Sequence, residues 1–110
     1  MTAYAIGHLT QVDIGPAIAE YIRGMDATLE PYQGRFLIHG NPPEVLEGEH
    51  RGDLIIIAFP DIDRARQWYA SPAYQAILPL RRRHAQGTLM LVEGMPPGHR
   101  STDVLAELGL

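Results

Sequence analysis

The chain has 110 residues, of which 45% are hydrophobic and 20% charged, a composition typical of one folded soluble domain rather than of a disordered segment. Its formal net charge of −4 argues against nucleic acid as a partner, because binding to phosphates usually needs a basic surface. The sequence contains no cysteine and no lysine, which excludes disulfides, thiolate zinc sites, Schiff-base catalysis and lysine-containing phosphate loops.

The sequence also predicts that the protein has no membrane partner. The longest uninterrupted apolar run, Leu54 to Phe59, is far too short to span a bilayer. The N-terminal residues lack a basic region ahead of their apolar positions, so we expect no signal peptide. Together with the missing cysteines, this predicts a cytoplasmic protein.

In the first half of the chain, the pattern predicts a strand at 4–10, a helix that ends near Leu29 and a second strand at 35–40. Asp13 is the expected cap of the helix and Pro16 lies in its first turn. The second strand breaks at the two prolines of "GNPPE" and can resume at 44–48.

In the second half, residues 53–59 predict a central strand, since they are apolar on both faces. A helix begins at Pro60 and Asp61, breaks at Ser71 and restarts with Ser71 as its cap. Pro79 predicts that this helix kinks or ends one or two residues earlier. With a last strand at 87–94, the order β-α-β-β-α-β predicts a ferredoxin-like α+β sandwich.

The sequence further predicts a homodimer. The helices of this topology cover one face of the sheet, yet the strand at 53–59 places Leu54 and Ile56 on one face and Ile55 and Ile57 on the other. A second copy of the sheet is the natural cover for the remaining apolar face. Two such sheets face to face form a dimeric α/β barrel.

The domain is expected to cover residues 1–95, followed by an extension at 96–110. Two consecutive prolines interrupt the chain there, and a short apolar helix follows. A helix of that length is not stable alone. The extension is therefore expected either to dock on the partner subunit or to be flexible.

Several motifs, in this order, resemble those of the domain of unknown function 1330 family. They are "YQGRFLIHG" (32–40), "EVLEG" (44–48), "AFP" (58–60), "WYASPAY" (68–74) and "VEG" (92–94). The resemblance implies a ferredoxin-like fold that dimerises into an α/β barrel. It also implies membership of a superfamily of cofactor-free monooxygenases, isomerases and dehydratases that act on small, often aromatic molecules. Relatives often carry acidic residues at positions 8 and 58 and arginine at 39, whereas this chain has His8, Ala58 and His39.

Two histidines are the candidate catalytic residues. Strict alternation along the strands places His8 on the barrel-facing side, together with Arg35 and His39, and it places Phe36 and Ile38 under the helices. Imidazoles in an enclosed space can act as general acid and base, and Arg35 could orient a ligand beside them. The alternative is that both histidines only form structural hydrogen bonds.

The second group of candidates surrounds the break between the two helices. Trp68, Tyr69 and Tyr74 can line a ligand pocket, or can simply fill the corner that the break leaves. Arg81 matches an arginine of the family pattern and could face a carboxylate, either that of Glu93 or that of a ligand. These four residues and Arg35 complete the expected site, since the arginines next to Arg81 are explained by the helix C-terminus.

Metal and cofactor sites are not expected. Glu49 and His50 are adjacent and point apart in an extended chain, and flanking glycines favour a solvated turn. Two functions therefore stay open. One is a cofactor-independent enzyme or binding protein for a small, mostly apolar molecule, and the other is a non-catalytic dimeric module.

Overall fold

The structure is a computed structural model that describes all residues from 1 to 110. The element order confirms the βαββαβ topology, with the second helix split in two. The elements are β1 (Ala3–Val12), α1 (Pro16–Leu29), a 3-10 turn (Glu30–Tyr32), β2 (Arg35–His39), β3 (Asp53–Phe59), α2 (Ile62–Ala70), α3 (Pro72–Arg82), β4 (Ala85–Glu93), a second 3-10 turn (Ser101–Asp103) and α4 (Val104–Glu107).

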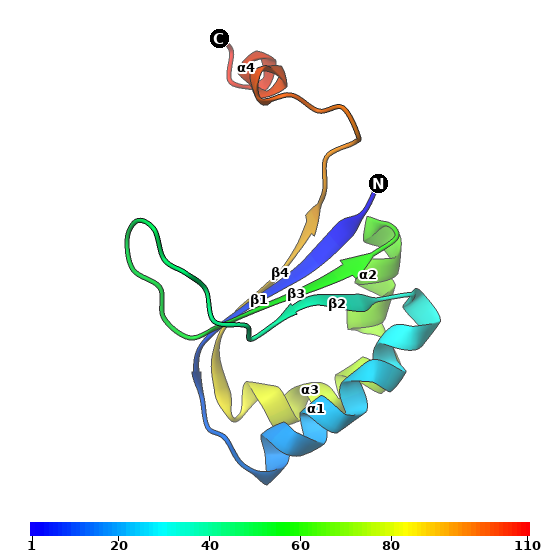
Figure 1. The fold of residues 1–110 in the computed structure, drawn as a ribbon. Coiled ribbons are helices and arrows are strands. Elements are labelled where there is room, and N and C mark those ends of the chain that lie inside the picture. Colours follow the sequence, from blue (N-terminus) through cyan, green and yellow to red (C-terminus); the bar gives the residue numbers. More distant parts are fainter.

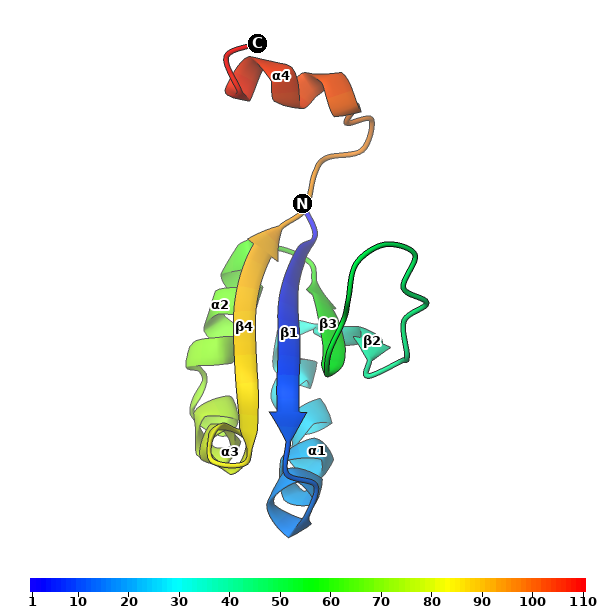
Figure 2. The same ribbon diagram turned by 90° about the vertical axis from the view of Figure 1, so that its left-hand side faces the viewer.

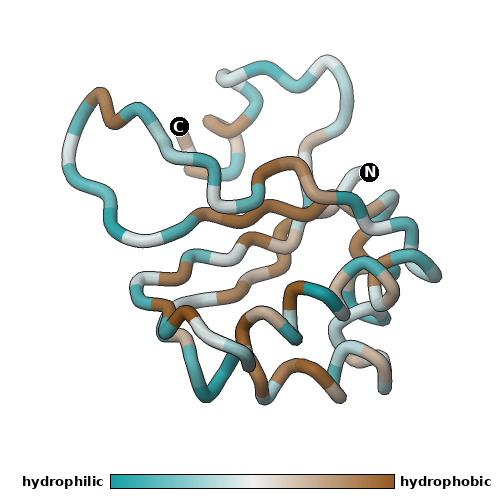
Figure 3. The backbone as a smooth tube through the Cα atoms, turned by 60° about the horizontal axis from the view of Figure 1, so that its bottom comes forward, coloured by the Kyte–Doolittle hydropathy of each residue, from teal (hydrophilic) through white to brown (hydrophobic).

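The four strands form one antiparallel sheet in the order β2-β3-β1-β4, and α1, α2 and α3 cover one of its faces (Figures 1 and 2). β3 is central, as its two-sided apolar sequence predicts. The other face is open, and Leu37, Met90 and Val92 are 45%, 46% and 43% exposed. Figure 3, coloured by hydropathy, shows hydrophobic residues along much of the length of the strands.

The helix starts confirm one of the two expected caps, that of Ser71, and show Asp61 as a further cap. The Asp61 carboxylate accepts a hydrogen bond from the Arg64 amide at 2.8 Å, and the Ser71 hydroxyl accepts one from the Tyr74 amide at 3.2 Å. The prediction for Asp13 was wrong, because α1 begins after Gly15 without a side-chain cap. Instead, the Asp13 amide donates to the His84 carbonyl at 2.7 Å, which ties the end of β1 to the turn before β4.

The helix α3 continues through Pro79 to Arg82, so of the two predicted outcomes, a kink or an end near this proline, the end does not occur. Proline removes one hydrogen bond of the helix, the one to the carbonyl of Gln75. Buried Tyr74 and Leu78 hold the turns on the N-terminal side of the proline against the core. This packing keeps the helix continuous despite the missing bond.

A β-bulge in β2 changes which side chains face the helices. Phe36 lies opposite Ile57, but Ile38 lies opposite Ile56, so Leu37 is an extra residue in the strand. After the bulge, the alternation is reversed. His39 therefore shares the helix-covered face with Phe36, and their rings stack with centroids 4.3 Å apart. The predictions of a barrel-facing His39 and a helix-facing Ile38 were both wrong.

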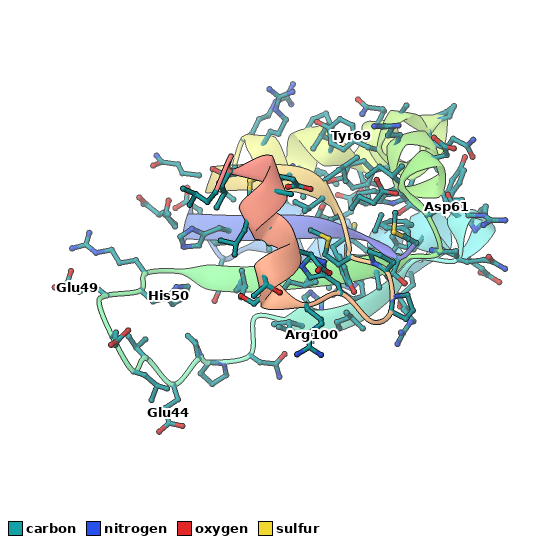
Figure 4. All side chains as sticks on the ribbon, turned by 90° about the horizontal axis from the view of Figure 1, so that it is seen from above. Glu44, Glu49, His50, Asp61, Tyr69 and Arg100 are labelled. Atoms are coloured by element: carbon teal, nitrogen blue, oxygen red, sulfur yellow. The ribbon has the colours of Figure 1, made fainter.

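The segment after β2 is a long exposed loop rather than a resumed strand at 44–48. Pro42 and Pro43 have no amide hydrogen to offer a neighbouring strand, and β2 is the edge of the sheet. Glu44 and Glu49 lie at the outer end of this loop (Figure 4). The loop ends at Gly52, where β3 begins.

The core lies between the sheet and the helices. Trp68, Tyr74 and Phe59 are its largest fully buried side chains. The ring of Trp68 lies 4.2 Å from that of Tyr74 between centroids and 5.4 Å from that of Phe59, and its indole donates to the hydroxyl of buried Thr28 at 3.0 Å. Aromatic side chains thus fill the corner that the break between α2 and α3 leaves at Ser71.

The C-terminal extension lies beyond the end of β4 and away from helices α1 to α3 (Figure 1). Its apolar side chains are largely exposed, with Leu105, Leu108 and Leu110 at 43%, 64% and 86%. No helix in the structure combines the length and the apolarity that crossing a bilayer requires.

Candidate functional site

A cavity of about 230 Å³ lies between the sheet and the helices α1 and α3. Of its 19 lining residues, 14 are hydrophobic. Gly7 of β1 contributes to the floor together with Ile55 of β3 and Leu89 of β4. A Cβ atom on Gly7 would lie 3.7 Å from Cβ of Ile55, so the missing side chain leaves part of the space open.

Two isoleucines that line the cavity also reach solvent. Ile14, in the connection between β1 and α1, is 84% exposed, and Ile22 of α1 is 48% exposed. The cavity therefore opens beside the first half of α1. His39 and Asp53 of the sheet also line the cavity and are exposed, so its accessible side carries both apolar and polar groups.

Two tyrosines and an arginine from the helices form the polar part of the cavity wall. The hydroxyls of Tyr21 and Tyr74 are 2.9 Å apart, and Cζ of Arg81 lies 5.9 Å from the centroid of the Tyr21 ring. Burial raises the pKa of Tyr21 far above its usual value, and Tyr74 adds to this, while Arg81 opposes it. Burial tends to lower the pKa of Arg81, but Tyr74 and Tyr21 outweigh it and raise that pKa. At neutral pH the Tyr21 hydroxyl is therefore neutral and the Arg81 guanidinium is charged.

The sheet contributes His39 and Asp53 to the same cavity. The β-bulge directs His39 to this face, and its backbone amide donates to the Asn41 side chain at 3.0 Å. The Gly40 amide donates to the Leu54 carbonyl at 3.0 Å, which fixes the end of β2 beside the start of β3. An imidazole and a carboxylate thus line the sheet side of the cavity, and the arginine lines the helix side.

Four of the residues expected from the sequence line this cavity, namely His39, Trp68, Tyr74 and Arg81. His8 does not, because it lies on the open face of the sheet. Its Nε2 atom is 2.6 Å from the carbonyl oxygen of Arg51, and its ring stacks on that of His50 at 5.3 Å between centroids. His8 and His39 are on opposite faces of the sheet and cannot share one substrate within a protomer.

Arg35 and Tyr69 also lie outside the cavity. Arg35 pairs with Ala58 on the open face. The ring of Tyr69 packs against Trp68 and Tyr74 at the corner between the helices, with centroid distances of 6.3 and 5.6 Å. Nor does Arg81 form an ion pair with Glu93, which is at the far end of β4.

Sequence reasoning missed three residues of the cavity, namely Gly7, Tyr21 and Asp53. Tyr21 falls on the apolar stripe of α1, where the sequence pattern indicates a core residue. Only the packing of α1 on α3 brings its hydroxyl beside that of Tyr74. A glycine inside a strand often marks a close approach or an open space, which is the one signal that pointed to Gly7. No group of three or more histidine and acidic side chains is placed to hold a metal ion.

The family model described as a domain of unknown function, DUF1330, matches residues 2–95. The chain belongs to this family. The match ends where the C-terminal extension begins, so the DUF1330 domain contains the whole cavity. No curated protein is significantly similar in sequence.

Solved structures similar to this DUF1330 protein share its fold at low identity. A protein of unknown function from Rhodopseudomonas palustris is 19% identical with a TM-score of 0.64, over 87% of this chain and 84% of that one. A dimeric ferredoxin-like protein of unknown function from Jannaschia sp. is 14% identical with a TM-score of 0.62, over 87% and 100%. SnoaB, a cofactor-independent oxygenase from Streptomyces nogalater, is 13% identical with a TM-score of 0.53, over 90% and 98%. These similarities establish the ferredoxin-like fold.

Proposed function

We propose that this protein is a homodimer in which each protomer binds a small, mostly apolar molecule between the sheet and the helices. The observation that carries the proposal is the cavity itself, which is apolar, open at one side and lined by a few polar groups from both layers. Such a combination is typical of ligand sites. Its volume suits a single ring or a short chain rather than a drug-sized ligand, because pockets for the latter start at about 300 Å³.

A cavity-filling variant tests this proposal. In Gly7→Val the new methyl groups would occupy the cavity floor, while the Cβ atom itself meets Ile55 and Leu89 at ordinary contact distances of 3.7 Å or more. We expect the variant to keep its melting temperature and to lose binding of small aromatic probes, as followed by ligand-observed NMR. Ile6→Val is the matched control, since the neighbouring side chain points to the open face. Unchanged probe binding in Gly7→Val would rule out the cavity as the site.

Cofactor-independent catalysis is a second candidate function, of the isomerase, monooxygenase or dehydratase type. It is favoured by His39, whose imidazole lines the cavity at its exposed side, where a general base could reach a bound molecule. The cofactor-independent oxygenase SnoaB shares the fold, which supports this by analogy alone.

The general-base role is testable without knowing the substrate. An aryl ketone such as phenylacetone exchanges the protons next to its carbonyl with deuterated water, and a base in the cavity should accelerate this exchange. We expect wild type to accelerate it and His39→Ala not to do so, while His8→Ala behaves like wild type. Equal acceleration by wild type and His39→Ala would rule out His39 as the base, and no acceleration by wild type would favour the non-catalytic alternative.

A further inference from the structure

Arg81 is a cation in the cavity wall that has no acidic partner. The three ion pairs of the chain are Arg64–Asp61, Arg66–Asp63 and His99–Asp103, and Arg81 is in none of them. Its neighbours Arg82 and Arg83 are exposed to water, whereas Arg81 is partly buried. A guanidinium that has given up part of its hydration gains more from an anion than one in solvent does.

The groups around Arg81 fit one end of a ligand. The hydroxyls of Tyr21 and Tyr74 are 2.9 Å apart, so when one donates to the other, the hydrogen of the second can be turned toward an incoming oxygen. The planar fork of arginine matches the two oxygens of a carboxylate, and such pairs are the stronger kind of hydrogen bond. A guanidinium beside two phenols thus makes a site for a single planar anion.

A doubly charged phosphate fits the same place less well. Arg81 is the only arginine among the lining residues, and this protein has no lysine. The residue also lies in the last turn of α3, where the helix dipole is negative and disfavours anionic charge. One positive charge in this setting balances one negative charge.

We propose, as a refinement that rests on the proposed function, that the ligand is a small organic carboxylate whose acid group pairs with Arg81 beside Tyr21 and Tyr74. Its apolar body lies over Gly7, Ile55 and Leu89 on the floor of the cavity. The end of the ligand opposite the acid group faces the sheet side, where His39 and Asp53 stand.

The test compares acids with their neutral amides. Benzoate, phenylacetate and hexanoate, each with its matching amide, are titrated into the full-length protein at neutral pH, with affinity measured by calorimetry or NMR. We expect at least one acid to bind about tenfold or more tightly than its amide, as one charge-assisted interaction allows. Arg81→Gln should remove this preference by weakening the binding of the acid far more than that of the amide. Arg82→Gln is the matched control and should keep the preference.

Each outcome bears on a different statement. Acids and amides that bind equally well, with loss of both in Gly7→Val, would overturn the carboxylate inference and leave the proposed function standing. Binding of neither class to wild type would overturn both. A preference for acids that survives Arg81→Gln would place the anion site elsewhere. Should Arg81→Gln prove unstable, Arg81→Lys keeps the charge but not the planar fork, and the acid preference should then fall without vanishing.

Discussion

Gly52, at the end of the long loop, is held against the backbone of β1. Its φ is +80°, and a Cβ atom there would overlap the carbonyl oxygen of Leu9 and lie 2.7 Å from Cα of Thr10. We expect Gly52→Ala to lower the free energy of unfolding by more than about 2 kcal/mol, because the left-handed backbone and the clash both penalise alanine.

Gly48 provides the matched control for this substitution. It has nearly the same φ, +79°, but nothing lies within 4 Å of its missing Cβ. Gly48→Ala should therefore cost only the backbone term, about 1 kcal/mol. Urea denaturation of the two variants measures the difference, and equal losses would show that the contact with β1 is not rigid.

Tyr21 makes the stability of the protein sensitive to alkaline pH. Since burial raises the pKa of Tyr21 above its unfolded value of about 10, the folded protein prefers the protonated phenol. The stabilisation is complete below about pH 10 and is lost as the pH rises beyond it, by up to about 1.4 kcal/mol per pH unit. In Tyr21→Phe the decline above pH 10 should be shallower than in wild type, as measured by urea denaturation between pH 8 and 11. If the unfolding free energies of wild type and Tyr21→Phe fell in parallel above pH 10, Tyr21 would not be the source of the decline.

At the scale of elements, α3 carries a defect that can be repaired. Pro79 is exposed and deprives the Gln75 carbonyl of its helical donor. Pro79→Ala should raise the free energy of unfolding by about 1–3 kcal/mol, because it restores this bond and removes the clash of the ring.

Pro72→Ala is the matched control for the helix. Pro72 is in the first turn of α3, where the amide has no helical partner in any case. This substitution should bring no gain in thermal or urea denaturation. A gain in both variants would mean that the effect does not come from the restored hydrogen bond to Gln75, because removing a proline loosens the unfolded chain and by itself lowers stability.

The sheet shows how far sequence patterns determine which residues share a face. Alternation correctly predicts that Ala5 and Gly7 of β1 lie under the helices, because most of this strand is regular before a late irregularity near Thr10. It fails in β2, where one unpaired residue reverses the faces. Local sequence shows no signal for this bulge, since Leu37 suits either arrangement and only the pairing with β3 decides it.

Part of the candidate site could also be predicted from the sequence, because some of its residues follow a regular local pattern. Trp68, Tyr74 and Arg81 follow helical spacing, which places them on inward or partly inward positions without any long-range pairing. The relation of Tyr21 to Tyr74 depends on the packing of α1 on α3, across 53 positions of sequence. Such contacts are tertiary, so periodicity within each helix does not contain them.

The whole molecule should be a dimer through its open sheet face. Ile6 and Ile56 lie opposite each other near the centre of this face, and exposed Met90 and Val92 extend it. Ile6→Glu places a charge in the interface and should yield a monomer at micromolar concentration in sedimentation velocity. Leu46→Glu, on the exposed loop, is the control. A monomeric wild type would refute the dimer, whereas the docking of residues 96–110 on the partner stays a separate prediction.

The extra residue in β2 also bears on how this protein can evolve. Deleting a single codon at position 37 would remove the bulge and restore regular pairing with β3. After the deletion Phe36 would stay opposite Ile57 and His39 opposite Ile55, so both side chains would keep the helix-covered face. An in-frame deletion at the bulge thus shortens the strand without changing which of its residues line the cavity. The bulge therefore lets this edge strand gain or lose one residue in evolution while the ligand site keeps its lining.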